Sequence, residues 1–196
     1  HLADFRLSLE AKGGTVDHTR LTCQRVRDAF DGCKFKKLVD LNAGRLSGWL
    51  SGRRKAGLSV ASSNHYLTAC KSFGSWLMKD RRWPANEFAH LSRMNSAVDV
   101  RHERRAMSQE DLSQLIETAK QEMPFRGVSG PDRAVLYQVA AYTGLRVSEL
   151  ASLTESSFDL GTSPTVTLEA SYSKHRREDV LPVHPDLSRR LRAWFL

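Results

Sequence analysis

Residues 134–150 have the sequence AVLYQVAAYTGLRVSEL, and this stretch decides the fold of the second half of the chain. Its first nine residues are nearly all apolar, which predicts a buried helix. Gly144 can end that helix, and Arg146 follows at once at the start of a short second helix. Glu149 lies three residues further on the same helical face and can hold the guanidinium. A fixed guanidinium suits two phosphate oxygens, but an ordinary surface Arg–Glu pair has the same spacing.

Four amphipathic helices are predicted before this stretch, within residues 1–91. The first covers residues 2–10, and Thr15 is a good N-cap for the second. One face of the second helix carries residues spaced by three or four positions, namely Val16, Thr19, Cys23, Val26 and Phe30. A third helix is expected over residues 43–54, and a fourth begins near Ser59 and ends before Trp83-Pro84. These helices predict a small all-α domain.

The chain changes character after this domain. Residues 92–106 lack helical periodicity and are interpreted as a linker, and residues 107–196 are interpreted as a second domain. Ser108 should cap a helix that runs to about Lys120. Further on, residues 165–169 and 179–183 alternate with period 2 around a polar, basic stretch, which predicts a β-hairpin. The expected fold class is therefore mainly α: an all-α domain followed by part of an α+β domain.

Charge is distributed unevenly between the two halves. The chain has a net charge of +8, and residues 1–100 hold 17 Lys/Arg against 9 Asp/Glu. Residues 101–196 hold 13 of each. The excess favours a polyanion-binding module, although a solvated basic surface is an equal alternative on charge alone.

Other site classes find no support in the sequence. No apolar run approaches the ~20 residues of a membrane span, and no signal peptide is indicated. The three cysteines and the histidines lack zinc-ligand spacing, so no metal or cofactor is expected. An odd cysteine count without a disulfide framework fits a reducing cytoplasm, where we expect the protein to act.

Residues 143–150, TGLRVSEL, resemble the first-arginine motif of the tyrosine recombinases, the phage-integrase family that includes Xer-like enzymes. Three more segments resemble this family in order and spacing. Residues 105–108 resemble the opening of its catalytic domain, and residues 173–183 resemble the β-hairpin that carries its active-site lysine. Residues 64–77 resemble the last long helix of its all-α, SAM-like core-binding domain. The resemblance implies two domains that form a C-shaped clamp on duplex DNA.

The resemblance also implies roles for individual residues. Arg146 corresponds to the first catalytic arginine, Glu149 to the acidic residue that supports it, and Lys174 to the hairpin lysine. In this family a tyrosine attacks a DNA phosphodiester and forms a 3′-phosphotyrosyl link, without ATP or metal. Arginines neutralise the phosphate oxygens, and the lysine protonates the leaving 5′-oxygen. Arg176 and Arg177 are close rivals of Lys174, so its assignment depends on the resemblance.

The sequence departs from the family pattern at its end. The family places a His-x-x-Arg box and the nucleophilic tyrosine after the hairpin, and residues 184–187 do not match that box because Leu187 stands where arginine is needed. The tyrosines Tyr66, Tyr137, Tyr142 and Tyr172 are in unsuitable positions. We therefore expect the chain to be part of a longer protein and to lack the nucleophile.

The expected activity of the parent protein is site-specific DNA recombination or integration. Its partners would be double-stranded DNA and other recombinase protomers in a tetramer, with no membrane. Candidate DNA contacts are basic or polar residues of both domains: Arg53, Arg54, Lys55, Ser63, His65, Lys71, Arg104, Arg105 and Arg176. A non-catalytic DNA-binding regulator is the alternative function. An RNA-associated protein is disfavoured because no aromatic-rich strand platform is indicated.

Overall fold

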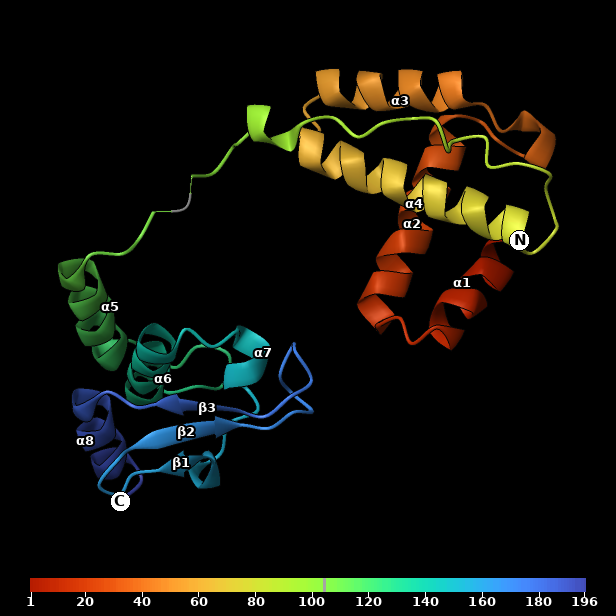
Figure 1. Cartoon of the computed structure of the whole chain (residues 1–196). Coiled ribbons are helices and arrows are strands. Elements are labelled where there is room, and N and C mark those ends of the chain that lie inside the picture. Colours follow the sequence, from red (N-terminus) through yellow and green to blue (C-terminus); the bar gives the residue numbers. More distant parts are fainter. Residues whose placement is uncertain (104) are drawn as a thin grey trace. The chain divides into compact units, whose positions relative to one another are not determined.

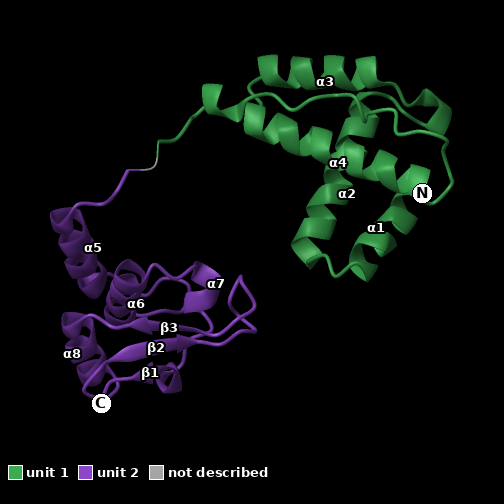
Figure 2. Cartoon of the chain, in the orientation of Figure 1, with its two compact units in different colours: residues 1–103 green, residues 104–196 purple. Residues whose placement is uncertain are grey.

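The computed structural model describes residues 1–103 and 105–196. The chain divides into two compact units, residues 1–103 and residues 104–196 (Figure 2). Arg104, one of the predicted DNA contacts, lies outside the described residues. Each unit has its own apolar core.

Unit 1 is entirely helical in its described residues. Its α-helices are α1 (Leu2–Ala11), α2 (Val16–Gly32), α3 (Ala43–Lys55) and α4 (Val60–Lys79), with short 3-10 turns at Leu38–Asp40 and Ser96–Val98 (Figure 1). The side chains of Thr15, Asn42 and Ser59 cap α2, α3 and α4 by accepting a backbone N–H three residues later. The four predicted helices are therefore confirmed.

The core of unit 1 forms where α2 and α1 pack against the long helix α4. Aromatic rings fill it: Phe73 makes edge-on contacts with Phe5 and Phe30 at centroid distances of 5.3 Å in each pair. The predicted inward face of α2 is confirmed for Thr19, Cys23 and Val26. It is wrong for Val16, which is 82% exposed as the first residue of the helix. Periodicity identifies a helical face, but not the turn at which neighbouring helices begin to cover it.

Part of the predicted linker is attached to unit 1. Asn64 exchanges two hydrogen bonds with the backbone of Met94, at 2.8 and 3.0 Å. The Asp99 carboxylate accepts the N–H of Val60 at 2.7 Å, at the first turn of α4. Side-chain bonds of this kind cannot be read from hydrophobic periodicity, because they join residues more than 25 positions apart.

Unit 2 combines four α-helices with a small sheet. The helices are α5 (Gln109–Gln121), α6 (Gly130–Thr143), α7 (Val147–Leu150) and α8 (Pro185–Trp194), and a 3-10 turn covers Glu155–Ser157. The strands β1 (Phe158–Asp159), β2 (Thr165–Leu168) and β3 (Asp179–Pro182) form an antiparallel sheet in the order β1-β2-β3. The predicted hairpin is confirmed, whereas β1 was missed because two residues show no alternation. The predicted fold class, mainly α with a mixed second domain, is also confirmed.

The core of unit 2 lies where α6 and α8 pack against the sheet. Its buried residues are Val135, Val139, Val166, Val183, Leu187 and Leu191. A second cluster joins α5 to α6 through Ile116, Ala119 and Ala134. The expectation that α6 is buried all round is only partly met, since Leu136 is 40% exposed and Tyr142 is 39% exposed. Leu136 lines an apolar groove of about 520 Å³ between α6 and α8.

Candidate DNA-cleavage site

The candidate site begins where α6 ends. Gly144 has φ +66°, a left-handed conformation that glycine adopts without steric cost, and its N–H bonds to the carbonyl of Ala140. The hydroxyl of Thr143 donates to the carbonyl of Val139 and accepts the N–H of Leu145. These contacts turn the chain sharply, so that Arg146 becomes the N-cap residue of α7.

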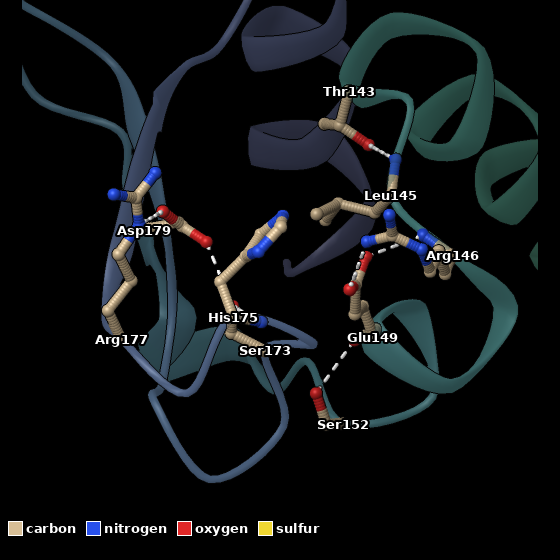
Figure 3. Close-up of polar contacts among 9 residues, drawn as sticks. All are labelled: Thr143, Leu145, Arg146, Glu149, Ser152, Ser173, His175, Arg177 and Asp179. Atoms are coloured by element: carbon tan, nitrogen blue, oxygen red, sulfur yellow. Dashed lines mark hydrogen bonds and ion pairs between the residues drawn. The ribbon is translucent and has the colours of Figure 1, made fainter.

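Glu149 holds Arg146 through two hydrogen bonds (Figure 3). One carboxylate oxygen accepts the backbone N–H of Arg146 at 2.8 Å, and the other accepts Nη1 of its guanidinium, also at 2.8 Å. The Glu149 side chain is only 4% exposed, whereas that of Arg146 is 55% exposed. The buried carboxylate therefore fixes the backbone N–H and one guanidinium nitrogen of Arg146, while more than half of the arginine side chain stays exposed to solvent.

The pKa of Glu149 is lowered from its usual value. The main cause is the backbone N–H of Arg146, followed by the guanidinium of Arg146, and the backbone N–H of Lys174 acts in the same direction. Burial opposes these effects but does not outweigh them. Glu149 is thus ionised at neutral pH, and its carboxylate is where the α6–α7 junction meets the β2–β3 hairpin.

The hairpin connection, residues 169–178, presents a basic surface. Ser173 is buried within it, and the backbone N–H of Arg176 bonds to the carbonyl of Ser173 at 3.0 Å. Lys174 follows Ser173 directly and is exposed. Among the described residues, the Lys174 ammonium has no hydrogen-bond or ion-pair partner. The site thus holds one cation anchored by a carboxylate and, among the described residues of the adjoining loop, two unpaired cations, Lys174 and Arg176.

Comparison with known proteins finds similar sequences and similar folds among related enzymes. No family model matches the chain. Tyrosine recombinase XerC of Xanthomonas campestris pv. campestris is 25% identical over 193 residues, which are 98% of this chain and 56% of XerC. The alignment includes the stretch from the end of α6 to the hairpin, since it covers almost the whole chain. The chain is similar to this tyrosine recombinase along nearly its whole length. It spans about half the length of the curated relatives that it matches.

Solved structures of the family share the fold. A lambda integrase dimer bound to a COC′ core site matches with a TM-score of 0.75 at 16% identity, over 97% of this chain and 51% of that one. A lambda integrase tetramer bound to a Holliday junction matches with a TM-score of 0.72 at 17% identity, over 97% and 53% of the two chains. These likenesses establish the fold of the chain.

The predicted DNA contacts of unit 1 differ in their surroundings. Arg53, Lys55 and His65 are exposed. Arg54 instead donates to the hydroxyl of Ser63 at 2.7 Å, and Ser63 is only 3% exposed. In this structure Ser63 holds Arg54 and does not present its hydroxyl at the surface. Sequence position alone could not show this, because Ser63 and the exposed His65 share the same polar run.

The remaining predicted contacts are spread over three segments. The ammonium of Lys71 donates to the carbonyl of Leu91 at 2.8 Å, so it also ties the polypeptide after α4 to unit 1. Arg105 is exposed at 3.9 Å from Asp111, and Arg176 is exposed at the hairpin with φ +53°. Within the described part of the chain, no cluster of His, Cys, Asp or Glu could hold a metal ion. No described helix is long and apolar enough to cross a membrane.

Two residues near Lys174 were missed by sequence reasoning. Ser173 donates its hydroxyl proton to the Asp179 carboxylate at 2.9 Å, across the base of the hairpin loop (Figure 3). Asp179 also pairs with Arg177 at 3.4 Å. A serine and an aspartate on either side of a basic tip were the available signal, but nothing in that pattern says that the serine turns inward.

Proposed function

We propose that this chain binds duplex DNA and supplies two of the catalytic groups of a site-specific recombinase. In this proposal unit 1 is the core-binding domain and unit 2 is part of the catalytic domain. Arg146 is the first catalytic arginine, Lys174 is the general acid, and Glu149 positions Arg146. The nucleophilic tyrosine lies outside these 196 residues.

The observation that carries the proposal is the anchored guanidinium of Arg146. A surface arginine in an ordinary ion pair has a flexible stem and an exposed partner. Here the partner is a buried carboxylate that binds both the backbone and the side chain of Arg146. Donors held in advance around a developing negative charge need no reorganisation during the reaction. That arrangement supports transition-state binding of phosphate oxygens at Arg146.

The proposed cleavage step is a transfer of the phosphoryl group from DNA to tyrosine. The phenolate oxygen of the tyrosine forms a bond to phosphorus, the bond from phosphorus to the 5′-oxygen breaks, and Lys174 gives a proton to that oxygen. Arg146 neutralises the non-bridging oxygens during the transfer. The Lys174 ammonium is unpaired among the described residues, and the backbone N–H of Lys174 helps to lower the pKa of Glu149, which favours Lys174 over the equally unpaired Arg176.

DNA binding is proposed to depend mainly on unit 1. Its excess of positive charge can displace counterions from phosphates, and Arg53, Lys55 and His65 are exposed for such contacts. The relatives suggest the assembly: lambda integrase was solved as a tetramer on a Holliday junction. We propose that the full-length protein likewise acts in the cytoplasm with further protomers on DNA.

A trapping experiment tests this proposal. A cleavage site is first selected from a random duplex library with the full-length protein, and is then prepared with a nick that prevents religation. We expect the full-length protein to form a covalent adduct and the 196-residue chain to bind the duplex without one. An adduct mapped to Tyr66, Tyr137, Tyr142 or Tyr172 would refute the external nucleophile. Salt-sensitive binding with no adduct from the full-length protein would favour the non-catalytic DNA-binding regulator.

A further inference from the structure

We infer that Ser173 and Asp179 form a clasp that positions Lys174 for proton donation. This inference rests on the proposed function, because it concerns the same cleavage step. It adds two positioning residues to Arg146, Lys174 and Glu149. Neither touches the reacting atoms; both act through the backbone that carries Lys174.

The burial of Ser173 is the first observation. Ser173 is 5% exposed, although Tyr172 before it is 55% exposed and Lys174 after it is also exposed. A polar side chain turned inward within a basic surface loop must find a partner, since an unpaired buried hydroxyl is costly. Ser173 finds one in Asp179, to which it donates at 2.9 Å.

The anchor for this hydrogen bond is a strand. Asp179 is the first residue of β3 and is paired with Leu168, the last residue of β2. One oxygen of its carboxylate accepts Ser173, and the other lies 3.4 Å from the guanidinium of Arg177. This hydrogen bond ties the middle of the loop, residues 169–178, to the end of the sheet. The loop is therefore anchored at its middle as well as at its two ends.

The clasp constrains the backbone at Lys174 from both sides. The Ser173 hydroxyl also accepts the N–H of His175 at 3.3 Å, and the Ser173 carbonyl accepts the N–H of Arg176. The backbone of Lys174 therefore lies within a small turn that the hydroxyl and the carbonyl of Ser173 hold together. The backbone N–H of Lys174 helps to lower the pKa of Glu149, the residue that holds Arg146. Breaking the clasp should release the general acid from the anchored arginine.

The chemistry of the leaving group separates positioning from simple folding. Replacing the bridging 5′-oxygen by sulfur gives a thiolate leaving group, which departs without a proton because thiols ionise near pH ~8.5. A defect in proton donation should disappear on this substrate. A defect in folding or in phosphate binding should remain.

The experiment compares single-turnover cleavage of oxygen-bridged and sulfur-bridged nicked duplexes by full-length variants. We expect Ser173→Ala and Asp179→Ala to slow oxygen-bridged cleavage by roughly 10- to 100-fold, the range expected for a misplaced catalytic group. Both should approach the wild-type rate on the sulfur-bridged duplex, as Lys174→Ala should. Ser173→Thr keeps the hydroxyl and should restore the oxygen-bridged rate. Ser171→Ala, an exposed serine of the same loop, is the matched control and should change neither rate.

The outcomes distinguish a failure of this inference from a failure of the proposed function on which it rests. If Ser173→Ala is equally slow on both duplexes, or unimpaired on the oxygen-bridged one, the clasp does not position the general acid. If Lys174→Ala is equally slow on both duplexes, Lys174 is not the general acid and the proposed function itself fails. Arg146→Ala should stay slow on both, which shows that the sulfur substrate does not restore every variant.

Discussion

The two units use positive charge in different ways. Unit 1 contains the whole excess of Lys and Arg, and several of these side chains, such as Arg53 and Lys55, are exposed. Unit 2 has balanced charge. Yet among the described residues it is unit 2 that contains the one arginine held by a buried carboxylate through both its backbone and its side chain.

This difference separates two physical tasks. Attraction of a polyanion depends on the number of cations and tolerates small displacements, because released counterions supply the driving force. Stabilisation of a transition state depends on the position of a single cation and tolerates little displacement. The following predictions test this separation, beginning with the largest expected effect.

The largest effect should follow substitution of Arg146. Arg146→Ala in the full-length protein should lower single-turnover cleavage by at least ~10²-fold, the scale for removing one transition-state donor. Arg146→Lys should restore little, because a single ammonium cannot replace a planar fork of N–H donors. Cleavage by Arg146→Lys at the wild-type rate would show that charge alone is needed, and the distinction between the units would weaken.

The separate cores predict separate destabilisation. Leu77 is 0% exposed in unit 1 and Leu187 is 1% exposed in unit 2. Substitution of either by alanine should destabilise its own unit by about 2–5 kcal/mol. Hydrogen exchange measured by mass spectrometry can localise the change. If each variant raised exchange equally in both units, the chain would have one cooperative core instead of two.

Salt dependence should identify the cations that contact phosphates. Arg53→Ala with Lys55→Ala should reduce the log–log salt slope of duplex binding by roughly 0.9 per contact removed. The matched control is Arg6→Ala with Arg20→Ala, which removes the same charge from cations paired with Glu10 and Asp17. Equal slope changes in the two double variants would mean that only net charge matters.

The smallest effect concerns Glu149 and pH. Because its folded-state pKa is lowered, Glu149 contributes stability above its unfolded pKa of ~4.3 and loses that contribution as the pH falls through the folded value. Glu149→Gln should therefore be less stable than wild type at pH 7, and the difference should shrink below pH ~4.3. Thermal unfolding at a series of pH values measures it. A difference that grows on acidification would contradict the assigned direction of the pKa shift.

Sequence patterns predicted the helices and hairpin because these elements depend on local periodicity and capping. The end of α6 at Gly144 and the cap at Thr15 are local features of this kind. The Arg146–Glu149 contact was predictable for the same reason, since a glutamate at the third helical position commonly reaches back to the backbone N–H of the N-cap residue. The inward turn of Ser173 was not predictable, because it depends on the register that places Asp179 at the start of β3.

The exposure of individual polar side chains likewise could not be predicted from the local sequence pattern. Ser63 and His65 lie two positions apart in one polar run, yet Ser63 is buried against Arg54 and His65 is exposed. The packing of α3 on α4 decides between them, and that packing depends on side chains elsewhere in both helices.

The separation of binding charge from catalytic charge can be tested directly in the full-length protein. Duplex affinity and the single-turnover cleavage rate at saturating protein are measured for Arg146→Ala and for Arg53→Ala with Lys55→Ala. The account predicts that Arg146→Ala binds with nearly wild-type affinity and cleaves at least ~10²-fold more slowly, while the double variant binds weakly but cleaves at nearly the wild-type rate once saturated. If both variants lost affinity and cleavage rate in the same proportion, the two units would not divide these tasks.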